Sequence, residues 1–234
     1  MSAITAFIYI PQQPLYVAFF VVLAFSLYAQ FRVSSAYAKN SKILSRGGIS
    51  GREAAAAVMA NAGITGVEIE ETGGRLTDHY DPAKKILVLS SENYRGTSLA
   101  AVGVAAHEAG HALQHKEGYS LLEFRMALAP MTIVASRVIM ILFFASFFLF
   151  RGLSGPILEI AILAFAIMTV FQLVTLPVEY DASRRAKAQL VSLGILDADE
   201  MPGVNQVLDA AALTYLAAFV LTLINLLSLL SRRN

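Results

Sequence analysis

The stretch SLAAVGVAAHEAGHALQHKEG, residues 98–118, decides the fold. Its apolar residues recur three and four positions apart, as at Leu99, Val102 and Ala106, which is the spacing of one face of an α-helix. The pattern ends at Gly118, and glycine commonly follows the last residue of a helix. We therefore predict a helix here, and this helix carries three of the four histidines in the chain.

Residues 107–111, His-Glu-Ala-Gly-His, match the pattern H-E-x-x-H. Two positions four apart lie on one face of a helix, one turn apart, so His107 and His111 can hold one Zn²⁺ ion at about 2.0–2.1 Å. Zinc lowers the pKa of a bound water to about 7, and Glu108 is placed to accept its proton. The competing interpretation is a helix with two histidines that have only structural hydrogen bonds.

A catalytic zinc site needs a third protein ligand and an open position. The chain has no cysteine, so the candidates are the remaining histidines and nearby acids: His79, His115, Glu179 and Asp181. His115 lies too far along the helix, because residues 107–115 span about 12 Å at 1.5 Å per residue. Glu179 follows Pro177 at the start of a predicted helix and is better placed.

Long apolar runs indicate an integral membrane protein. Of the 234 residues, 56% are apolar, against about 45–50% in soluble domains. Residues 15–29, 130–150, 157–174 and 210–230 form the four runs, which are long enough to cross, or nearly cross, a bilayer about 30 Å thick. A cleaved signal peptide is the alternative for the first run, with Ala36-Tyr37-Ala38 as its cleavage site, but that run lacks a basic n-region.

The runs divide the chain into five segments. We predict a first transmembrane helix at 1–30, a cytoplasmic peptidase domain at 31–125, a transmembrane hairpin at 126–176, a helix with the third metal ligand at 177–205, and a fourth transmembrane helix with the tail at 206–234. Residues 31–125 hold eleven of the eighteen basic and ten of the seventeen acidic residues. This concentration of charge is typical of a domain that faces water.

The charged segment predicts an α+β fold. Ser50 and Glu53 have the spacing of a capping box ahead of an alanine-rich helix. Residues 67–70 alternate between apolar and acidic side chains, as in a half-exposed strand. Residues 76–80 and 86–89 predict two further strands joined by a tight turn. We expect a small antiparallel sheet beside the zincin-like H-E-x-x-H helix, with strand 86–89 free to pair with an extended substrate.

Basic residues predict the side of the membrane. Because a hairpin of two crossings returns the chain to the side it left, residues 31–125 and 177–205 share one side. That side carries most of the basic residues near the membrane ends: Arg32, Lys39, Lys42, Arg46, Arg184, Arg185 and Lys187. The positive-inside rule then places the active site in the cytoplasm, although Arg232 and Arg233 on the opposite side weaken this prediction.

Three stretches together resemble a known family: Asp78-His79-Tyr80-Asp81-Pro82, residues 107–115, and Pro177 to Arg185. They are similar to the YugP-type neutral zinc metallopeptidases of bacterial membranes, over nearly the whole chain. The resemblance implies that His107, His111 and Glu179 bind zinc and that Glu108 is the general base.

A more distant resemblance, to membrane peptidases of the CAAX-processing and heat-shock type, puts Ser183 where those enzymes carry an aspartate. Asp181 or another group could then orient a histidine ligand. The candidates for stabilising the oxyanion are His79, Tyr80 and Arg184.

We therefore expect a gluzincin-like zinc metalloendopeptidase of the bacterial cell membrane, with one zinc ion per chain and Glu108 as general base. Its partners would be the lipid bilayer and a polypeptide substrate, with membrane-associated polypeptides among the candidates, and we expect no nucleic acid. The alternative is a non-catalytic membrane protein that uses zinc for structure or sensing; a zinc hydrolase of a non-peptide bond also stays open. A metal transporter is disfavoured, because the apolar runs hold no histidine and only Glu159 among acids.

Overall fold

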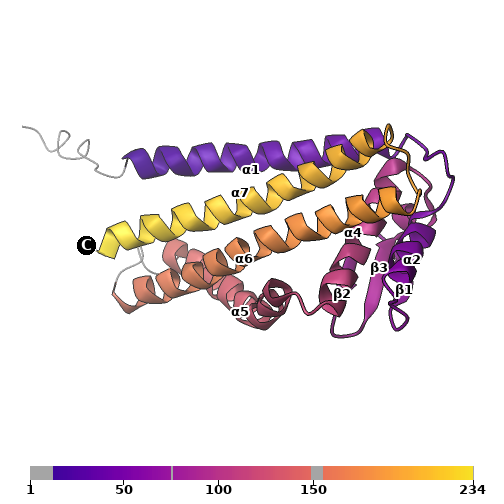
Figure 1. The fold of residues 1–234 in the computed structure, drawn as a ribbon. Helices are drawn as coiled ribbons and strands as arrows, with labels where there is room; N and C mark the ends of the chain where they lie inside the picture. Colours follow the sequence, from indigo (N-terminus) through magenta and orange to yellow (C-terminus); the bar gives the residue numbers. More distant parts are fainter. Residues whose placement is uncertain (1–12, 75, 149–154, 234) are drawn as a thin grey trace, which may run out of the picture. The chain divides into compact units, whose positions relative to one another are not determined.

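The computed structural model describes residues 13–74, 76–148 and 155–233 (Figure 1). The chain divides into two compact units. The first consists of Met1–Tyr28, Leu128–Leu173 and Leu216–Asn234, and the second of Ala29–Ala127 and Val174–Tyr215. The five segment boundaries expected from the sequence stay predictions.

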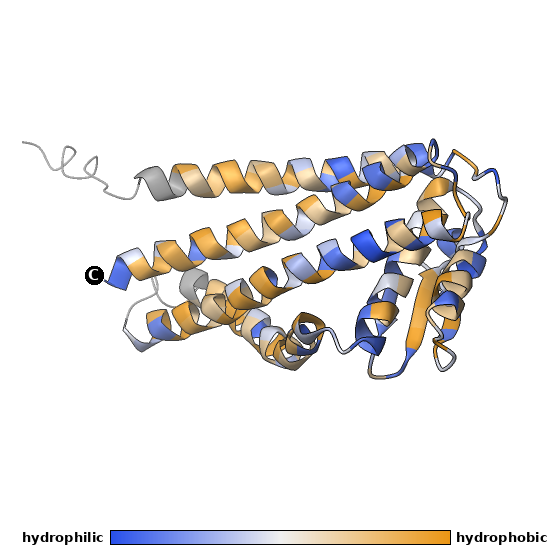
Figure 2. Ribbon diagram, in the orientation of Figure 1, coloured by the Kyte–Doolittle hydropathy of each residue, from blue (hydrophilic) through white to orange (hydrophobic). Residues whose placement is uncertain are grey.

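Among the described residues, four helices are long and apolar enough to cross a membrane. These are α1 (Gln13–Asn40), α5 (Ser120–Phe148), α6 (Pro156–Ser192) and α7 (Met201–Arg233). Figure 2 shows hydrophobic residues along much of each helix. The prediction of four membrane helices is confirmed, and residues 149–154 within the predicted transmembrane hairpin lie outside the described residues.

The helix that carries Glu179 differs from the prediction. The apolar run at 157–174 and the segment 177–205 were expected to form separate helices, but α6 is one helix of 37 residues with Pro177 inside it. An interior proline costs about 3 kcal/mol because it removes a backbone hydrogen bond and crowds the preceding turn. Burial of Val178 and Ala182 just beyond the proline offsets that cost. Glu179 therefore has a fixed position on a continuous helix.

The second unit packs three further helices and a sheet around one core. The helices are α2 (Gly51–Asn61), α3 (Ser91–Arg95) and α4 (Leu99–Lys116). The predicted capping box of α2 is present, with reciprocal hydrogen bonds between Ser50 and Glu53, and the helix predicted over residues 98–118 is α4. The largest buried side chains of this core include Val58, Leu87, Leu89, Val102, Leu190 and Val204.

The sheet has three strands in the order β1-β3-β2, with β1 at Glu68–Thr72, β2 at His79–Asp81 and β3 at Ile86–Ser90. β2 and β3 form the predicted antiparallel hairpin, but β1 pairs with β3 in parallel, so the sheet is mixed rather than purely antiparallel. Because β3 is the central strand, both of its edges are occupied. The prediction that residues 86–89 pair with an extended substrate is therefore wrong.

Candidate metal centre

The second unit brings His107, His111 and Glu179 together, and we call these three residues the triad. α4 presents both histidines on one face, and α6 presents Glu179 opposite them. The His107 Nε2 atom lies 3.2 Å from Glu179 Oε2, and His111 Nε2 lies 3.6 Å from the same oxygen. One ligand atom from each residue lies within 4.8 Å of the others. Glu179 lies 72 positions after His107 in the chain, so only tertiary packing produces this cluster.

The close approach of α4 and α6 depends on Gly110, between the two histidines. A Cβ atom at this position would lie 2.5 Å from the carbonyl oxygen of Ala182 and 3.1 Å from its carbonyl carbon. Real Cβ contacts essentially never fall below 3.0 Å. The glycine of the motif therefore lets the histidine helix lie directly against the backbone of the helix that carries Glu179.

The spacing of the triad fits a zinc ion. A tetrahedral centre with bonds of about 2.1 Å has ligand atoms about 3.4 Å apart, and the two imidazole-to-carboxylate distances are 3.2 and 3.6 Å. Two imidazoles and a carboxylate are also a donor set that zinc accepts. Both the chemistry and the spacing of these residues suit that ion.

Gln114 fixes the tautomer of His111. The Gln114 side-chain nitrogen donates to the Val178 carbonyl oxygen at 2.8 Å and to Asp181 Oδ2 at 3.0 Å. Because both partners are acceptors, the amide oxygen must face His111 Nδ1, 2.9 Å away. His111 therefore carries its proton on Nδ1, and a neutral His111 directs the Nε2 lone pair at the Glu179 carboxylate. A cation between these two groups would relieve the resulting repulsion.

Other neighbours hold the remaining members of the triad. His107 Nδ1 lies 3.1 Å from the Ser183 hydroxyl, which can orient the imidazole ring. Asp181 contacts no histidine of the triad directly and acts through Gln114. Arg125 of α5 donates to Glu179 Oε1 at 2.7 Å, which leaves Oε2 facing the imidazoles.

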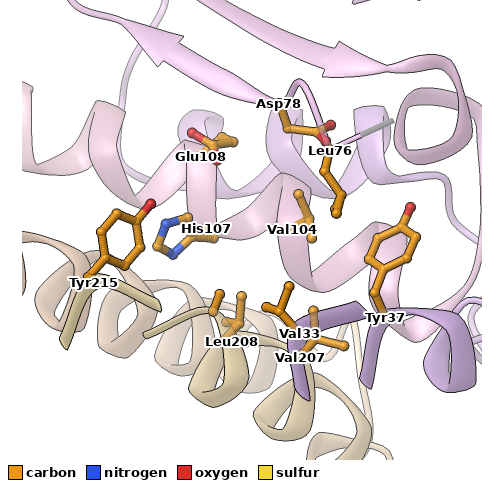
Figure 3. A pocket seen from close by; sticks show the side chains of 11 residues that line it. Val33, Tyr37, Leu76, Asp78, Val104, His107, Glu108, Val207, Leu208 and Tyr215 are labelled. Atoms are coloured by element: carbon orange, nitrogen blue, oxygen red, sulfur yellow. The ribbon is translucent and has the colours of Figure 1, made fainter. Parts of the chain in front are cut away.

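Glu108 lies beside the triad in a buried position. Only 9% of its surface is exposed, and this burial raises the pKa of its carboxyl to about 7, an effect that the nearby His107 opposes. It lines a cavity of about 140 Å³ together with His107 and Tyr215 (Figure 3). A carboxyl with a pKa near neutrality suits proton transfer at physiological pH.

Comparison with known proteins identifies the family. Residues 15–234 match the profile of a family described as "Putative neutral zinc metallopeptidase". The chain belongs to this family. It is also 43% identical over 205 residues to a protein of Bacillus subtilis (strain 168) named "Putative membrane protease YugP", and the match covers 88% of this chain and 90% of the relative. No solved structure matches.

The resemblance seen in the sequence is therefore confirmed, and the family and the structure together give a membrane-associated zinc metallopeptidase family member with a candidate His-His-Glu metal site. Sequence reasoning named the triad and Glu108. It missed Gln114, Arg125 and Tyr215 as neighbours of the site. Gln114 lies within the stretch that carries the resemblance, but Arg125 and Tyr215 stand in segments with no motif.

The other predicted candidates lie in different surroundings. His79 is exposed, and its Nδ1 lies 2.9 Å from the carbonyl oxygen of Thr77. The Tyr80 hydroxyl lies 2.8 Å from His115 Nδ1, and Arg184 pairs with Asp181. In these positions, none of the three proposed oxyanion donors contacts the triad. Their catalytic roles stay predictions.

Proposed function

We propose that this protein is a membrane-integrated zinc metalloendopeptidase of gluzincin type, with the second unit as its peptidase domain. The observation that carries the proposal is the meeting of two imidazole nitrogens from α4 with one carboxylate oxygen from α6 at 3.2 and 3.6 Å. Membership of a zinc metallopeptidase family supports it. Polypeptides are the substrates, and membrane-associated ones are the natural choice, because four helices of the described residues are long and apolar enough to cross a membrane.

The triad would hold the zinc ion, with one ion per chain, and Ser183, Gln114 and Arg125 would orient its three members. A bound zinc ion supplies Lewis acidity, which lowers the pKa of water to about 7 and polarises a substrate carbonyl. Glu108 takes the proton of the attacking water and later donates it to the leaving amine. Burial raises the pKa of Glu108 to about 7, which is close to the pKa of a zinc-bound water.

Tyr215 is the donor best placed to stabilise the oxyanion. It comes from α7 and lines the same cavity as His107 and Glu108 (Figure 3). Removing one such donor lowers kcat by about 10²–10³-fold in a hydrolase that depends on it. We expect Tyr215→Phe to lower kcat by this order while zinc content stays unchanged.

Two observations favour a catalytic site over a structural zinc site. Structural zinc usually has four protein ligands in a closed shell, and only three candidate ligands converge among the described residues. A carboxyl that does not belong to the triad, Glu108, is also buried beside it next to a cavity. Burying a carboxyl such as Glu108 costs free energy, and a site that only holds zinc for structure gains nothing from it.

The topology remains a proposal as well. The two stretches of the second unit, residues 29–127 and 174–215, hold most of the basic residues near the membrane ends, so the positive-inside rule favours a cytoplasmic active site in the cell membrane. Labelling of single cysteines introduced into this cysteine-free chain by a membrane-impermeant reagent would test the side. Labelling of the second unit from outside the intact cell would contradict the proposal.

The decisive test compares the detergent-solubilised wild type with Glu108→Gln, using casein and a labelled peptide library, with zinc quantified in both. Glu70→Gln is the matched control, because Glu70 is an exposed carboxylate on β1. We expect equal zinc in all three proteins, and cleavage by the wild type and the control only. Cleavage by Glu108→Gln at the wild-type rate would remove Glu108 as the base, and absence of zinc from all three would overturn the proposal.

A further inference from the structure

We propose that the cavity beside Glu108 is a specificity pocket that accepts one apolar side chain of the substrate, of leucine or phenylalanine size. We call it the Glu108 cavity. This inference rests on the proposed peptidase function and adds the substrate preference of the same site. Because His107 and Glu108 line the cavity, its occupant would lie close to the bond that is cut.

The lining of the Glu108 cavity is mainly aliphatic. α1, α4 and α7 each supply a side of it, and the segment before β2 supplies its lip. Figure 3 shows His107, Glu108 and Tyr215 toward one end and Tyr37 toward the other. The aliphatic lining residues are Val33, Leu76, Val104, Val207, Leu208 and Ala211. An apolar occupant would therefore exchange water for hydrocarbon contacts over most of its surface.

The acidic residue at the lip, Asp78, does not make the cavity a site for a basic side chain. Its carboxylate already accepts hydrogen bonds from the Ser90 amide at 2.8 Å, from the Ser90 hydroxyl at 3.1 Å, and from the Asn93 side-chain nitrogen at 2.9 Å. The Tyr37 hydroxyl in turn donates to Asn93 Oδ1 at 2.7 Å. Because these polar groups are hydrogen-bonded to one another, they hold the cavity wall in place. A bound side chain would therefore contact mainly the aliphatic atoms of the wall.

Leu76 provides a second, independent sign of function. Its φ angle is 55°, a left-handed conformation that is rare for a bulky residue and costs about 1–3 kcal/mol. Its side chain is 48% exposed although it lines the cavity. Strain of this kind persists mainly at functional sites, and here it holds an apolar side chain at the lip, where an entering substrate would cover it.

The size of the cavity sets the class of side chain. Its volume is about 140 Å³, and an aliphatic protein cavity of about 150 Å³ is known to bind benzene. A phenylalanine ring or a leucine side chain therefore fits, glycine and alanine leave it partly empty, and aspartate or lysine would lose hydration without gaining a partner.

The test uses the full-length, zinc-loaded protein in detergent and peptides that differ at one position near the cleaved bond. That position carries Gly, Ala, Leu, Phe, Asp or Lys, and mass spectrometry gives the cut sites and kcat/KM. We expect kcat/KM for the Leu and Phe peptides to be at least tenfold higher than for the Gly, Asp and Lys peptides. One methylene group in a hydrophobic pocket changes kcat/KM about 10–200-fold.

Pocket variants separate a specificity role from a structural one. Ala211→Phe should fill the cavity and lower the Leu-to-Ala preference at least tenfold, whereas Ala60→Phe, the same change at an exposed site on α2, should not alter it. Leu76→Asn should raise KM for Leu and Phe peptides more than for Gly peptides, because the pocket loses an apolar side chain while asparagine tolerates the left-handed backbone. This variant keeps the test decisive if Ala211→Phe does not fold.

The outcomes distinguish this inference from the proposed function. A wild type that cleaves peptides with no side-chain preference, or a preference that neither variant shifts, overturns the pocket and leaves the peptidase standing. If Glu108→Gln cleaves as well as the wild type, the proposed function fails and the pocket fails with it. A copurified lipid that Ala211→Phe displaces while peptide preference stays constant would make the cavity a lipid site and also overturn the inference.

Discussion

Replacing Gly110 by alanine tests whether the close contact between α4 and α6 builds the metal centre. The added Cβ atom would lie 2.5 Å from the Ala182 carbonyl oxygen, and the contact must lengthen by at least about 0.5 Å to reach 3.0 Å. Because the oxygen belongs to the backbone of α6, no side-chain rotation relieves the overlap. The two helices must move apart, and Glu179 must move away from both histidines.

The expected magnitudes follow from this displacement. Overpacking of this kind costs about 1–3 kcal/mol, and the better helix propensity of alanine returns up to about 1 kcal/mol, so we expect a net loss of about 1–2 kcal/mol in unfolding free energy. Zinc sites hold ligand distances to within about 0.2 Å. A shift of this size should therefore weaken zinc binding about 10–100-fold, the range found when groups that orient a ligand are lost.

The assay combines thermal unfolding in detergent, with and without zinc, and zinc titration against a competing chelator. Gly66→Ala is the control, since a Cβ atom there would meet nothing within 4 Å. We expect the control to match the wild type in both measurements. If Gly110→Ala binds zinc with wild-type affinity and melts at the wild-type temperature, the close helix contact does not position the triad and the reasoning is refuted.

Three further predictions concern the neighbours of the triad. Gln114→Leu removes the acceptor for the His111 Nδ1 proton and should weaken zinc binding about 10–100-fold, measured by chelator competition; unchanged affinity would contradict the tautomer assignment. Arg125→Met leaves Glu179 Oε1 without its donor and should lower the unfolding free energy of the metal-free protein by about 1–3 kcal/mol, whereas an unchanged melting temperature would show that this ion pair does not stabilise the fold. In the metal-free protein Glu108 has a raised pKa of about 7, so its stabilising contribution is fully present below about pH 4.5 and is lost as pH rises toward 7. Glu108→Gln should therefore become more stable than the wild type by up to about 3 kcal/mol above pH 7, and equal melting curves from pH 5 to 8.5 in chelator would contradict this.

The local part of the site could be predicted because it depends on local geometry. Residues four apart on a helix share a face whatever the rest of the fold does, so His107 and His111 were assigned from their spacing alone. The apolar periodicity of residues 98–118 predicted α4, and the capping box of Ser50 and Glu53 predicted α2, for the same reason. Four apolar runs of sufficient length also sufficed to predict four membrane helices.

Other features depended on tertiary packing, which can override a local preference and cannot be read from the sequence. Pro177 was taken as a helix start because proline weakens a helix interior, yet burial of Val178 and Ala182 keeps α6 continuous. β1 was expected in an antiparallel sheet, but it pairs in parallel with β3, because β3 lies between β1 and β2 in the sheet. Each error arises where packing overrides a local preference.

By itself the sequence determined the two histidines of the candidate metal site, the acid beside them, the helix that carries them and the membrane character of the chain. Only the tertiary structure decided that Gln114 fixes the tautomer of His111, that Arg125 holds Glu179, and that α1, α4 and α7 enclose a cavity beside Glu108. The physical reason is the range of the interactions. Backbone periodicity acts over one or two turns, whereas a hydrogen-bond partner or a cavity wall comes from whichever distant segment the packing of the core brings into contact.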